Sequence, residues 1–194
     1  MGRTSTARER ILSSALGLFH ERGYANVGVE DIMRSADVGK SSFYHFFQSK
    51  EALGVAVLDV YIDQMDREVF DQAFSQDVAP LDRFFRLIEI LSGENKPLIG
   101  CLGGNGAAEH AHNSEALRKK TREFFEHARA RFAQTFDDAI ADMSLLPNAP
   151  PEQLATACIA YIQGLLLMTK LTQSWDPMHD LGPMIANIWH PYLV

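Results

Sequence analysis

Apolar side chains recur every three or four residues along almost the whole chain, the spacing that is typical of amphipathic helices. In the first such segment they are Leu12, Ala15, Leu16 and Phe19, and Gly23 follows as a helix-ending residue. Because no segment alternates apolar and polar residues in the manner of a strand, we predict an all-α fold of about nine helices. The other helices are expected over residues 29–36, 40–47, 51–74, 80–91, 99–112, 114–143, 154–172 and 177–190.

The second and third predicted helices are short and are separated by a turn that contains Gly39, an arrangement typical of the DNA-binding helix-turn-helix. One face of the third helix would pack against the other two, and it consists of Phe43, Phe46 and Phe47. The opposite face carries hydroxyls and hydrogen-bonding rings that suit phosphates and base edges, from Ser41, Ser42, Tyr44 and His45. Taken alone, this polar face fits a merely solvated helix equally well.

The net charge of −7 is unusual for a protein that binds nucleic acid, but the distribution of the charge changes the picture. Residues 1–50 contain seven Lys or Arg and five Asp or Glu, a net charge of +2, whereas the remaining residues contain 11 and 20, a net charge of −9. A mildly basic head on an acidic body is compatible with a protein that touches phosphate at one end only. We predict a three-helix DNA-binding domain over residues 1–50 and a second helical domain over residues 51–194.

Three segments of the head together resemble the TetR family of transcriptional regulators: ILSSALGLFHERGY (11–24), VEDI (29–32) and VGKSSFYHFFQSKEAL (38–53). The resemblance implies that Lys50 lies on a DNA phosphate and that residues 51–194 bind an effector and dimerise. It also implies a recognition helix that reads double-stranded, palindromic operator DNA through Lys40, Ser41, Ser42, Tyr44 and His45. Gly28 departs from the Ser or Thr that the family commonly has near the start of its second helix.

Two cysteines lie far apart without the spacing of a disulfide framework, so both are expected as thiols. A proline break and several glycines surround Cys101, and in the first turn of a helix its thiolate would be favoured and its pKa lowered. The alternative for Cys101, and the preferred interpretation of Cys158, is a small buried apolar side chain. Asn105 is a candidate polar group of an effector pocket.

The stretch GCLxxN around Cys101, with Lys170 in LLLMTKL, resembles a branch of the TetR family that includes the N-ethylmaleimide-responsive and acrylate-responsive repressors. The resemblance implies that Cys101 senses electrophiles or oxidants, with Lys170 as a neighbour of its sulfur. Residues 159–170 are too apolar for an exposed helix, which predicts burial within the domain or against a partner chain. The resemblance also implies a homodimer through the last two long helices, which would set two recognition helices about one DNA turn apart.

Other chemistries find little support in the sequence. Ser-His-Asp and metal motifs at useful spacing are missing, and the tripeptide GKS at 39–41 lacks the earlier glycine of a phosphate-binding loop. Glu109, His110 and His112 do not suggest a metal site, because two histidines that are two residues apart diverge on a helix. We therefore expect no cofactor, no metal and no enzyme activity, with an all-α enzyme as the remote alternative.

These observations favour a DNA-binding regulator, and the family resemblance favours a repressor that a small effector or modification of Cys101 releases from its operator. The alternative within the same class is a non-covalent lipophilic effector with an inert Cys101. In either case the end of the helix that begins at Glu51 is expected to act as a lever that shifts the population of DNA-competent dimers. No membrane span and no signal-peptide core is predicted, so we expect a cytoplasmic protein.

Overall fold

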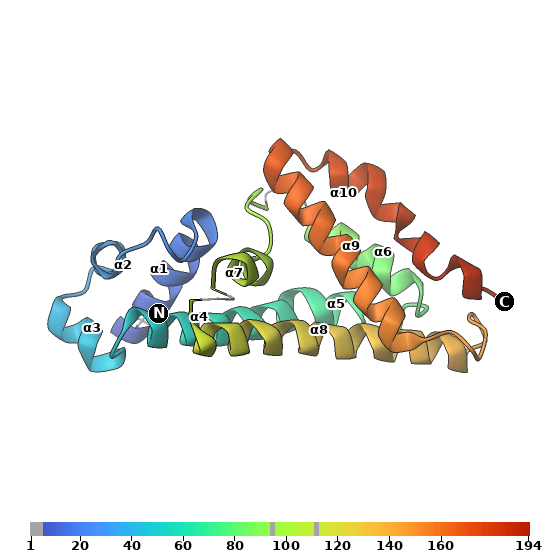
Figure 1. The fold of residues 1–194 in the computed structure, drawn as a ribbon, viewed down its shortest axis with the longest axis horizontal. Helices are drawn as coiled ribbons and strands as arrows, with labels where there is room; N and C mark the ends of the chain where they lie inside the picture. Colours follow the sequence, from blue (N-terminus) through green and yellow to red (C-terminus); the bar gives the residue numbers. More distant parts are fainter. Residues whose placement is uncertain (1–5, 94–95, 111–112) are drawn as a thin grey trace, which may run out of the picture. The chain divides into compact units, whose positions relative to one another are not determined.

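The computed structural model describes residues 6–93, 96–110 and 113–194, and these residues form helices and connecting turns without a β-strand (Figure 1). The all-α prediction is therefore confirmed. The α-helices are α1 (Ala7–Arg22), α2 (Val29–Ala36), α3 (Lys40–Phe46), α4 (Lys50–Met65), α5 (Asp71–Ala73), α6 (Asp82–Leu91), α7 (Leu102–His110), α8 (Glu115–Ala141), α9 (Pro151–Thr172) and α10 (Asp176–Leu181).

The contacts within the chain divide it into two compact units. The first combines Met1–Asp63 with Leu102–Phe124, and the second combines Gln64–Cys101 with Phe125–Val194. The first unit thus holds α1 to α3, most of α4, α7 and the first turns of α8. The functional division expected at residue 50 stays a prediction.

Helix α1 ends where the sequence predicts, and it begins at a capping box that the sequence analysis did not name. The Thr6 hydroxyl accepts a hydrogen bond from the Glu9 N–H (3.2 Å), and the Glu9 carboxylate accepts one from the Thr6 N–H (2.8 Å), which is a capping box. Gly23 follows the last turn with φ +82°, a value that favours glycine. The buried side chains form the expected stripe on one face: Ile11, Leu12, Ala15 and Phe19.

Helices α2 and α3 occupy the predicted positions, with one correction on α3. Phe43 and Phe47 are buried, but Phe46 is 38% exposed, so its predicted place on the packing face is wrong. Helix α3 ends at Phe46, and the extended backbone at Phe47 (φ −135°) lets that ring approach the Phe43 ring, with the centroids 6.2 Å apart. Phe43 and Phe47 therefore pack inward, and Phe46 is left on the outer side of the helix.

Two predicted helices are interrupted in the structure. The helix expected over residues 51–74 contains a π-helical segment, η1 (Asp66–Phe70), between α4 and α5. The last expected helix is α-helical only in α10 and continues as two 3₁₀ segments, η2 (Gly182–Ile188) and η3 (His190–Tyr192). Apolar periodicity does not distinguish these tighter and wider turns from an α-helix, because the backbone changes its hydrogen-bonding partner by only one residue.

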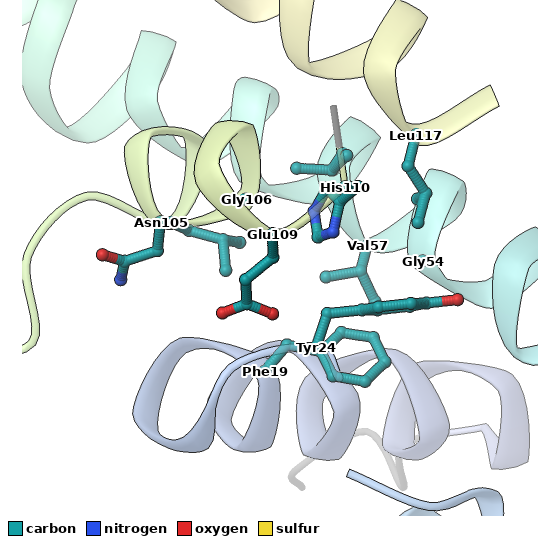
Figure 2. Close-up of a pocket in the computed structure, with 11 residues that line it drawn as sticks. Phe19, Tyr24, Gly54, Val57, Asn105, Gly106, Glu109, His110 and Leu117 are labelled. Carbon is teal, nitrogen blue, oxygen red and sulfur yellow. The ribbon is translucent and has the colours of Figure 1, made fainter. Parts of the chain in front are cut away.

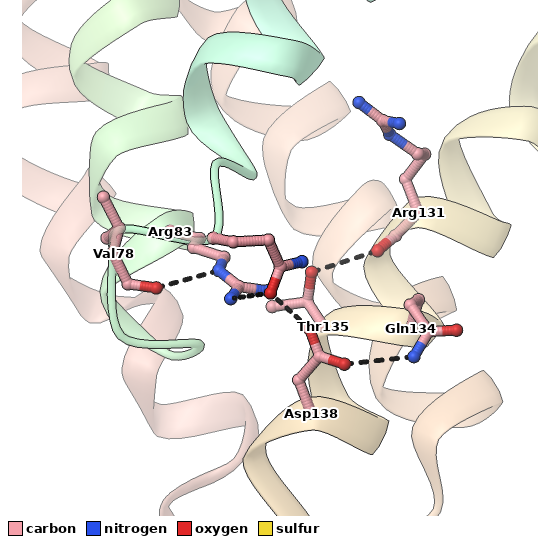
Figure 3. Close-up of polar contacts among 7 residues, drawn as sticks. Val78, Arg83, Arg131, Gln134, Thr135 and Asp138 are labelled. Atoms are coloured by element: carbon pink, nitrogen blue, oxygen red, sulfur yellow. Dashed lines mark hydrogen bonds and ion pairs between the residues drawn. The ribbon is translucent and has the colours of Figure 1, made fainter. Parts of the chain in front are cut away.

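An aromatic cluster and a buried ion pair hold the second unit together. The Phe84 and Phe136 rings stack with centroids 4.7 Å apart, and the Trp189 ring lies 5.1 Å from that of Phe84. Arg83, which is 4% exposed, donates to the Asp138 carboxylate (2.6 Å) and to the Val78 carbonyl (3.0 Å), as Figure 3 shows. The ion pair joins α6 to α8, and its Asp138 side chain is 26% exposed.

The carboxyl group of Asp138 is held in its charged form. Burial acts to raise the pKa of Asp138. The hydrogen bonds donated by Arg83 and Gln134 act to lower it and together outweigh burial, so the pKa lies below its ordinary value. Because the partner guanidinium is buried and this carboxylate is its counter-ion, loss of either group would leave a costly unpaired charge.

Helix α9 is the most apolar long helix of the described residues. By length and composition alone it passes as a membrane-spanning helix, which the sequence analysis did not predict, and 39% of its apolar window is buried in the protein. Core helices of soluble proteins pass the same test. Its buried face carries Leu154, Ala155, Cys158, Ile162, Leu165, Leu166 and Thr169.

Candidate functional site

The polar face of α3 is open to solvent in this chain. Ser42 is half-buried, and the other predicted DNA-reading residues are exposed: Lys40, Ser41, Tyr44 and His45. The exposed Phe46 extends this face, and its ring lies 4.8 Å from that of His45. The helix therefore presents hydroxyls, an ammonium, an imidazole and two aromatic rings together, a set that can contact both phosphates and bases.

The turn that sets the direction of α3 is held by α1. Asp37, directly after α2, has a left-handed backbone (φ 51°), and the Arg10 guanidinium donates to the carbonyls of Ala36 (3.0 Å) and Asp37 (3.4 Å). At the other end of α2, the Asp31 carboxylate accepts from the N–H of the N-cap residue Gly28 (3.0 Å), which is the half of a capping box that does not need an N-cap side chain. Sequence reasoning counted Arg10 only as positive charge, because its target is backbone.

Lys50 opens α4 and is half-buried. Its ammonium lies 4.2 Å from the centroid of the Tyr24 ring, a cation–π contact. Burial lowers the pKa of Lys50, against a smaller opposite effect of Glu109. The phosphate contact that was expected of Lys50 stays a prediction. The structure adds the cation–π contact with Tyr24, which the sequence analysis did not predict.

A small cavity lies where α7 meets α1 and α4 in the first unit (Figure 2). Asn105 and His110 line it from α7, and Tyr24 lines it from the loop after α1. Its volume is about 20 Å³, room for about one water molecule. Organic ligands need pockets of roughly 300 Å³ or more, so this cavity does not accept an organic effector in the described conformation, and the effector role of Asn105 stays a prediction.

His110 is the most unusual side chain of this cavity. It is 6% exposed, and its Nδ1 has no hydrogen-bond partner among the described residues. Burial lowers the pKa of the imidazole most; nearby Glu109 acts to raise it and Lys50 to lower it. The ring is therefore held neutral near physiological pH.

The two cysteines are both buried, in different settings. Cys101 is 7% exposed and directly precedes α7, after Gly100 with φ +76°. The sequence analysis expected Cys101 in the first turn of this helix, but the helix begins one residue later, at Leu102. Cys158 is fully buried on α9, and burial raises the pKa of its thiol, which keeps it protonated and unreactive. Lys170 is half-buried in the last turn of α9, in the same unit as Cys101.

The second unit has a larger groove that sequence reasoning missed. It has a volume of about 260 Å³ and lies between α6 and the segment of α10 and η2. Its lining mixes apolar and polar side chains: Phe85, Ile88, Glu89, Ser92, Met178, His179 and Pro183. No sequence signal marked it, because the two walls are about 90 residues apart and meet only in the fold.

A metal site finds no support in the part of the chain that the structure describes, where no three His, Cys, Asp or Glu side chains gather around one point. Glu109 and His110 are neighbours on α7, and His112, the third residue weighed in the sequence, lies outside the described residues.

Large apolar side chains are exposed together on the last helices. Leu167 (64%), Met168 (45%) and Leu171 (74%) project from the final turns of α9. Leu181 (43%) and Met184 (50%) project from α10 and η2, which pack against α9. An exposed apolar group of this kind is typical of an interface with another protein chain.

Comparison with known proteins identifies the family. The N-terminal description "Bacterial regulatory proteins, tetR family" matches residues 11–57, and the description "Tetracyclin repressor-like, C-terminal domain" matches residues 78–182. The transcriptional regulator AcuR of Cereibacter sphaeroides is 34% identical over 180 residues, which cover 91% of this chain and 82% of AcuR. The transcriptional repressor DhaR of Mycobacterium sp. strain GP1 is 31% identical over 195 residues, which cover 98% and 96%.

Solved structures agree. The regulatory protein TetR from Rhodobacter sphaeroides superposes with a TM-score of 0.88 at 30% identity, covering 95% of this chain and all of that one. The reduced form of NemR from Escherichia coli superposes with a TM-score of 0.84 at 27% identity, covering 94% and 97%. Members of this family bind DNA operators, are typically dimers and are generally not enzymes. On this evidence the chain belongs to the TetR family of bacterial transcription regulators.

Proposed function

We propose that this TetR-family regulator is a repressor that binds a palindromic operator as a homodimer in the cytoplasm. The observation that carries the proposal is the exposed polar face of α3, which buried Phe43 and the Arg10 contacts hold in one orientation. In this proposal Lys50 lies near a phosphate, and bases and neighbouring phosphates are read by Lys40, Ser41, Ser42, Tyr44 and His45. Repression is supported by the relatives DhaR and NemR, which are named repressors.

The dimer is proposed to form through α9 and the α10–η2 segment. Leu167, Met168 and Leu171 are exposed in the single chain although each is large and apolar. Burial of such side chains stabilises by about 1.5–3 kcal/mol each relative to exposure. A second copy of the chain would cover them, and two-fold symmetry would place the two α3 helices on successive major grooves.

Release from DNA is proposed to begin at Cys101. The relative NemR is described in a reduced form, and we take this as support for a redox-sensitive residue in the present chain. Cys101 directly precedes α7, so addition of an electrophile to its sulfur would insert new atoms into a nearly closed space and displace the start of that helix. Lys170 is proposed to stabilise the thiolate, as an ammonium in the same unit.

A non-covalent effector is the second candidate, and the groove between α6 and α10 favours it. Its volume of about 260 Å³ is close to the lower limit of small-molecule pockets, and its apolar walls include Phe85, Ile88 and Met178. A lipophilic compound with one polar group would fit this lining, with Glu89 and His179 available as hydrogen-bonding partners.

One titration tests both candidates. Operator binding is measured by fluorescence anisotropy with DNA from upstream of the protein's own gene, with and without 1,4-benzoquinone, for the wild type, Cys101→Ser and Cys158→Ser. The proposal expects loss of binding in the wild type and in Cys158→Ser, no recovery with excess thiol because addition of the quinone leaves a stable thioether, and no response in Cys101→Ser. Tight binding that quinone does not change would favour a non-covalent effector in the groove. Failure to find any specific DNA site in a genomic selection would refute the proposed DNA-binding function.

A further inference from the structure

The last turn of α7 reaches the DNA-binding head through a carboxylate. Glu109 Oε2 accepts a hydrogen bond from the N–H of Ala25 (3.1 Å), in the loop between α1 and α2, 84 residues away in the sequence. The same carboxylate lies so close to Gly23 that a β-carbon there would clash with Glu109 Oε1. The loop is therefore shaped around this carboxylate, and the contact depends on the small residue that ends α1.

A ring contact lies beside the hydrogen bond. The His110 ring meets the Tyr24 ring edge to face, with the centroids 5.1 Å apart and the planes at 78° (Figure 2). Glycines make room for both rings: a β-carbon at Gly106 would lie 2.6 Å from His110 Nε2, and one at Gly54 would lie 3.0 Å from Tyr24 Cε2. We call this contact of Glu109 and His110 with Tyr24 and Ala25 the joint. It is closely packed, and the cavity of about 20 Å³ is the space that remains.

Tyr24 connects this joint to both ends of the helix-turn-helix. It follows α1, and its ring carries the ammonium of Lys50 at 4.2 Å, at the start of the helix that follows α3. A second contact runs parallel: Ser114, before α8, donates its hydroxyl hydrogen to the Glu51 carboxylate (2.6 Å). The entry and the exit of the DNA-reading segment therefore both touch residues at the end of α7 or just after it.

Helix α7 has the properties of a short strut between Cys101 and this joint. It spans Leu102–His110, so its length is about 13 Å at 1.5 Å per residue. Since backbone hydrogen bonds hold successive turns of a helix together, we expect a displacement at its first residue to move its last. Cys101 is covalently attached to the first residue, and Glu109 and His110 are the last two.

We propose that Glu109, His110 and Tyr24 form a clasp through which α7 positions the helix-turn-helix, so that operator binding and the conformation of α7 are coupled. The three are positioning residues: they set where α3 and Lys50 lie, and they do not read DNA themselves. The clasp rests on the proposed operator binding, but it requires neither a reactive Cys101 nor any particular effector.

Reciprocity allows a test that needs no effector. If α7 controls the head, then operator DNA bound to the head must change α7 by the same coupling free energy. Hydrogen exchange of the peptide that covers α7 is measured by mass spectrometry for the full-length protein, with and without saturating operator duplex. The variants are Glu109→Ala, Glu109→Gln, which keeps a hydrogen-bond acceptor, and Glu126→Ala as a control that removes an exposed carboxylate from α8.

The clasp predicts that operator slows exchange in α7 by about fivefold or more in the wild type and in Glu126→Ala. The protection should be lost in Glu109→Ala and partly kept in Glu109→Gln, while all variants remain folded and saturable with DNA. The clasp would be overturned if the hydrogen-exchange rate of α7 in the wild type were the same with and without operator, or if the protection survived in Glu109→Ala. Either result would leave the operator binding intact. Absence of any operator would instead overturn the regulator, and the clasp with it.

Discussion

Replacement of Gly106 by alanine probes the packing between α7 and the head directly. A β-carbon at this position would lie 2.6 Å from His110 Nε2 and 3.3 Å from Cδ2, whereas ordinary contacts begin at about 3.4 Å. The imidazole must therefore retreat by about 0.8 Å, and it is only 6% exposed and packed against Tyr24. Overpacking of this kind costs about 1–3 kcal/mol.

Alanine also has an intrinsic advantage over glycine within a helix, about 1 kcal/mol. Gly17 on α1 provides the matched control, because a β-carbon there meets nothing within 4 Å. We expect Gly17→Ala to stabilise the protein by up to about 1 kcal/mol. Gly106→Ala should be neutral or destabilising by up to about 2 kcal/mol, the difference between the two opposing effects.

Thermal unfolding of the two variants and the wild type measures the difference. For a chain of this size 1 kcal/mol corresponds to about 2–4 °C in Tm, so the variants should differ by roughly 4–8 °C if the free energies differ by 2 kcal/mol. Urea titration at constant temperature checks that the slope m is unchanged. Equal rises in Tm for both variants would refute the reasoning, since they would mean that His110 moves aside without cost.

Four further predictions rest on single side chains of the two units. Arg83→Met should lower the free energy of unfolding by about 2–4 kcal/mol in a urea titration, because it leaves the Asp138 carboxylate without its buried partner; Arg83→Lys, which keeps the charge, should lose less. Because the folded pKa of Asp138 is lowered, its contribution to stability is full above the ordinary carboxyl pKa of about 4 and is lost as the pH falls below it; Asp138→Asn should flatten this acid limb. The lowered pKa of His110 acts in a second window: its contribution is full above about pH 6.5 and declines as the pH falls, so His110→Leu should reduce the loss of stability between pH 7 and pH 5, and an unchanged slope would contradict the burial of a neutral ring. If the proposed dimer forms through α9, Leu171→Glu should give monomers in sedimentation velocity and abolish operator binding. Met143→Glu, which replaces an apolar side chain that is 76% exposed outside α9 and α10, should leave both unchanged.

The sequence predicted the helices well because their stripes and their ends carry local signals. The Thr6–Glu9 capping box, Gly23 and the cap of α8 by Ser114, whose hydroxyl accepts from the Leu117 N–H at 3.1 Å, are all readable from a few neighbouring residues. The wrong placement of Phe46 has a different origin. Its orientation depends on where α3 ends, and an error of one residue at a helix end rotates a side chain by about 100°.

The site was less accessible to sequence reasoning because its contacts join distant segments. Nothing local to Glu109 indicates that its carboxylate reaches the Ala25 N–H, and Arg10 gives no sign that it holds the carbonyls of Ala36 and Asp37. Cys101 could be singled out from its glycine-rich surroundings. Its degree of burial could not, because burial depends on residues that pack around it from elsewhere in the fold.

The exposed apolar side chains on the last turns of α9 would make the stability of this protein depend on its concentration in the cell. If a second copy covers Leu167, Met168 and Leu171, part of the stability of each chain is supplied by association and varies with concentration. Each tenfold dilution of a dimer then removes about 1.4 kcal/mol from the free energy that keeps the two copies together. A regulator present in few copies would thus spend a larger share of its time as single chains, which could pair again with newly made subunits.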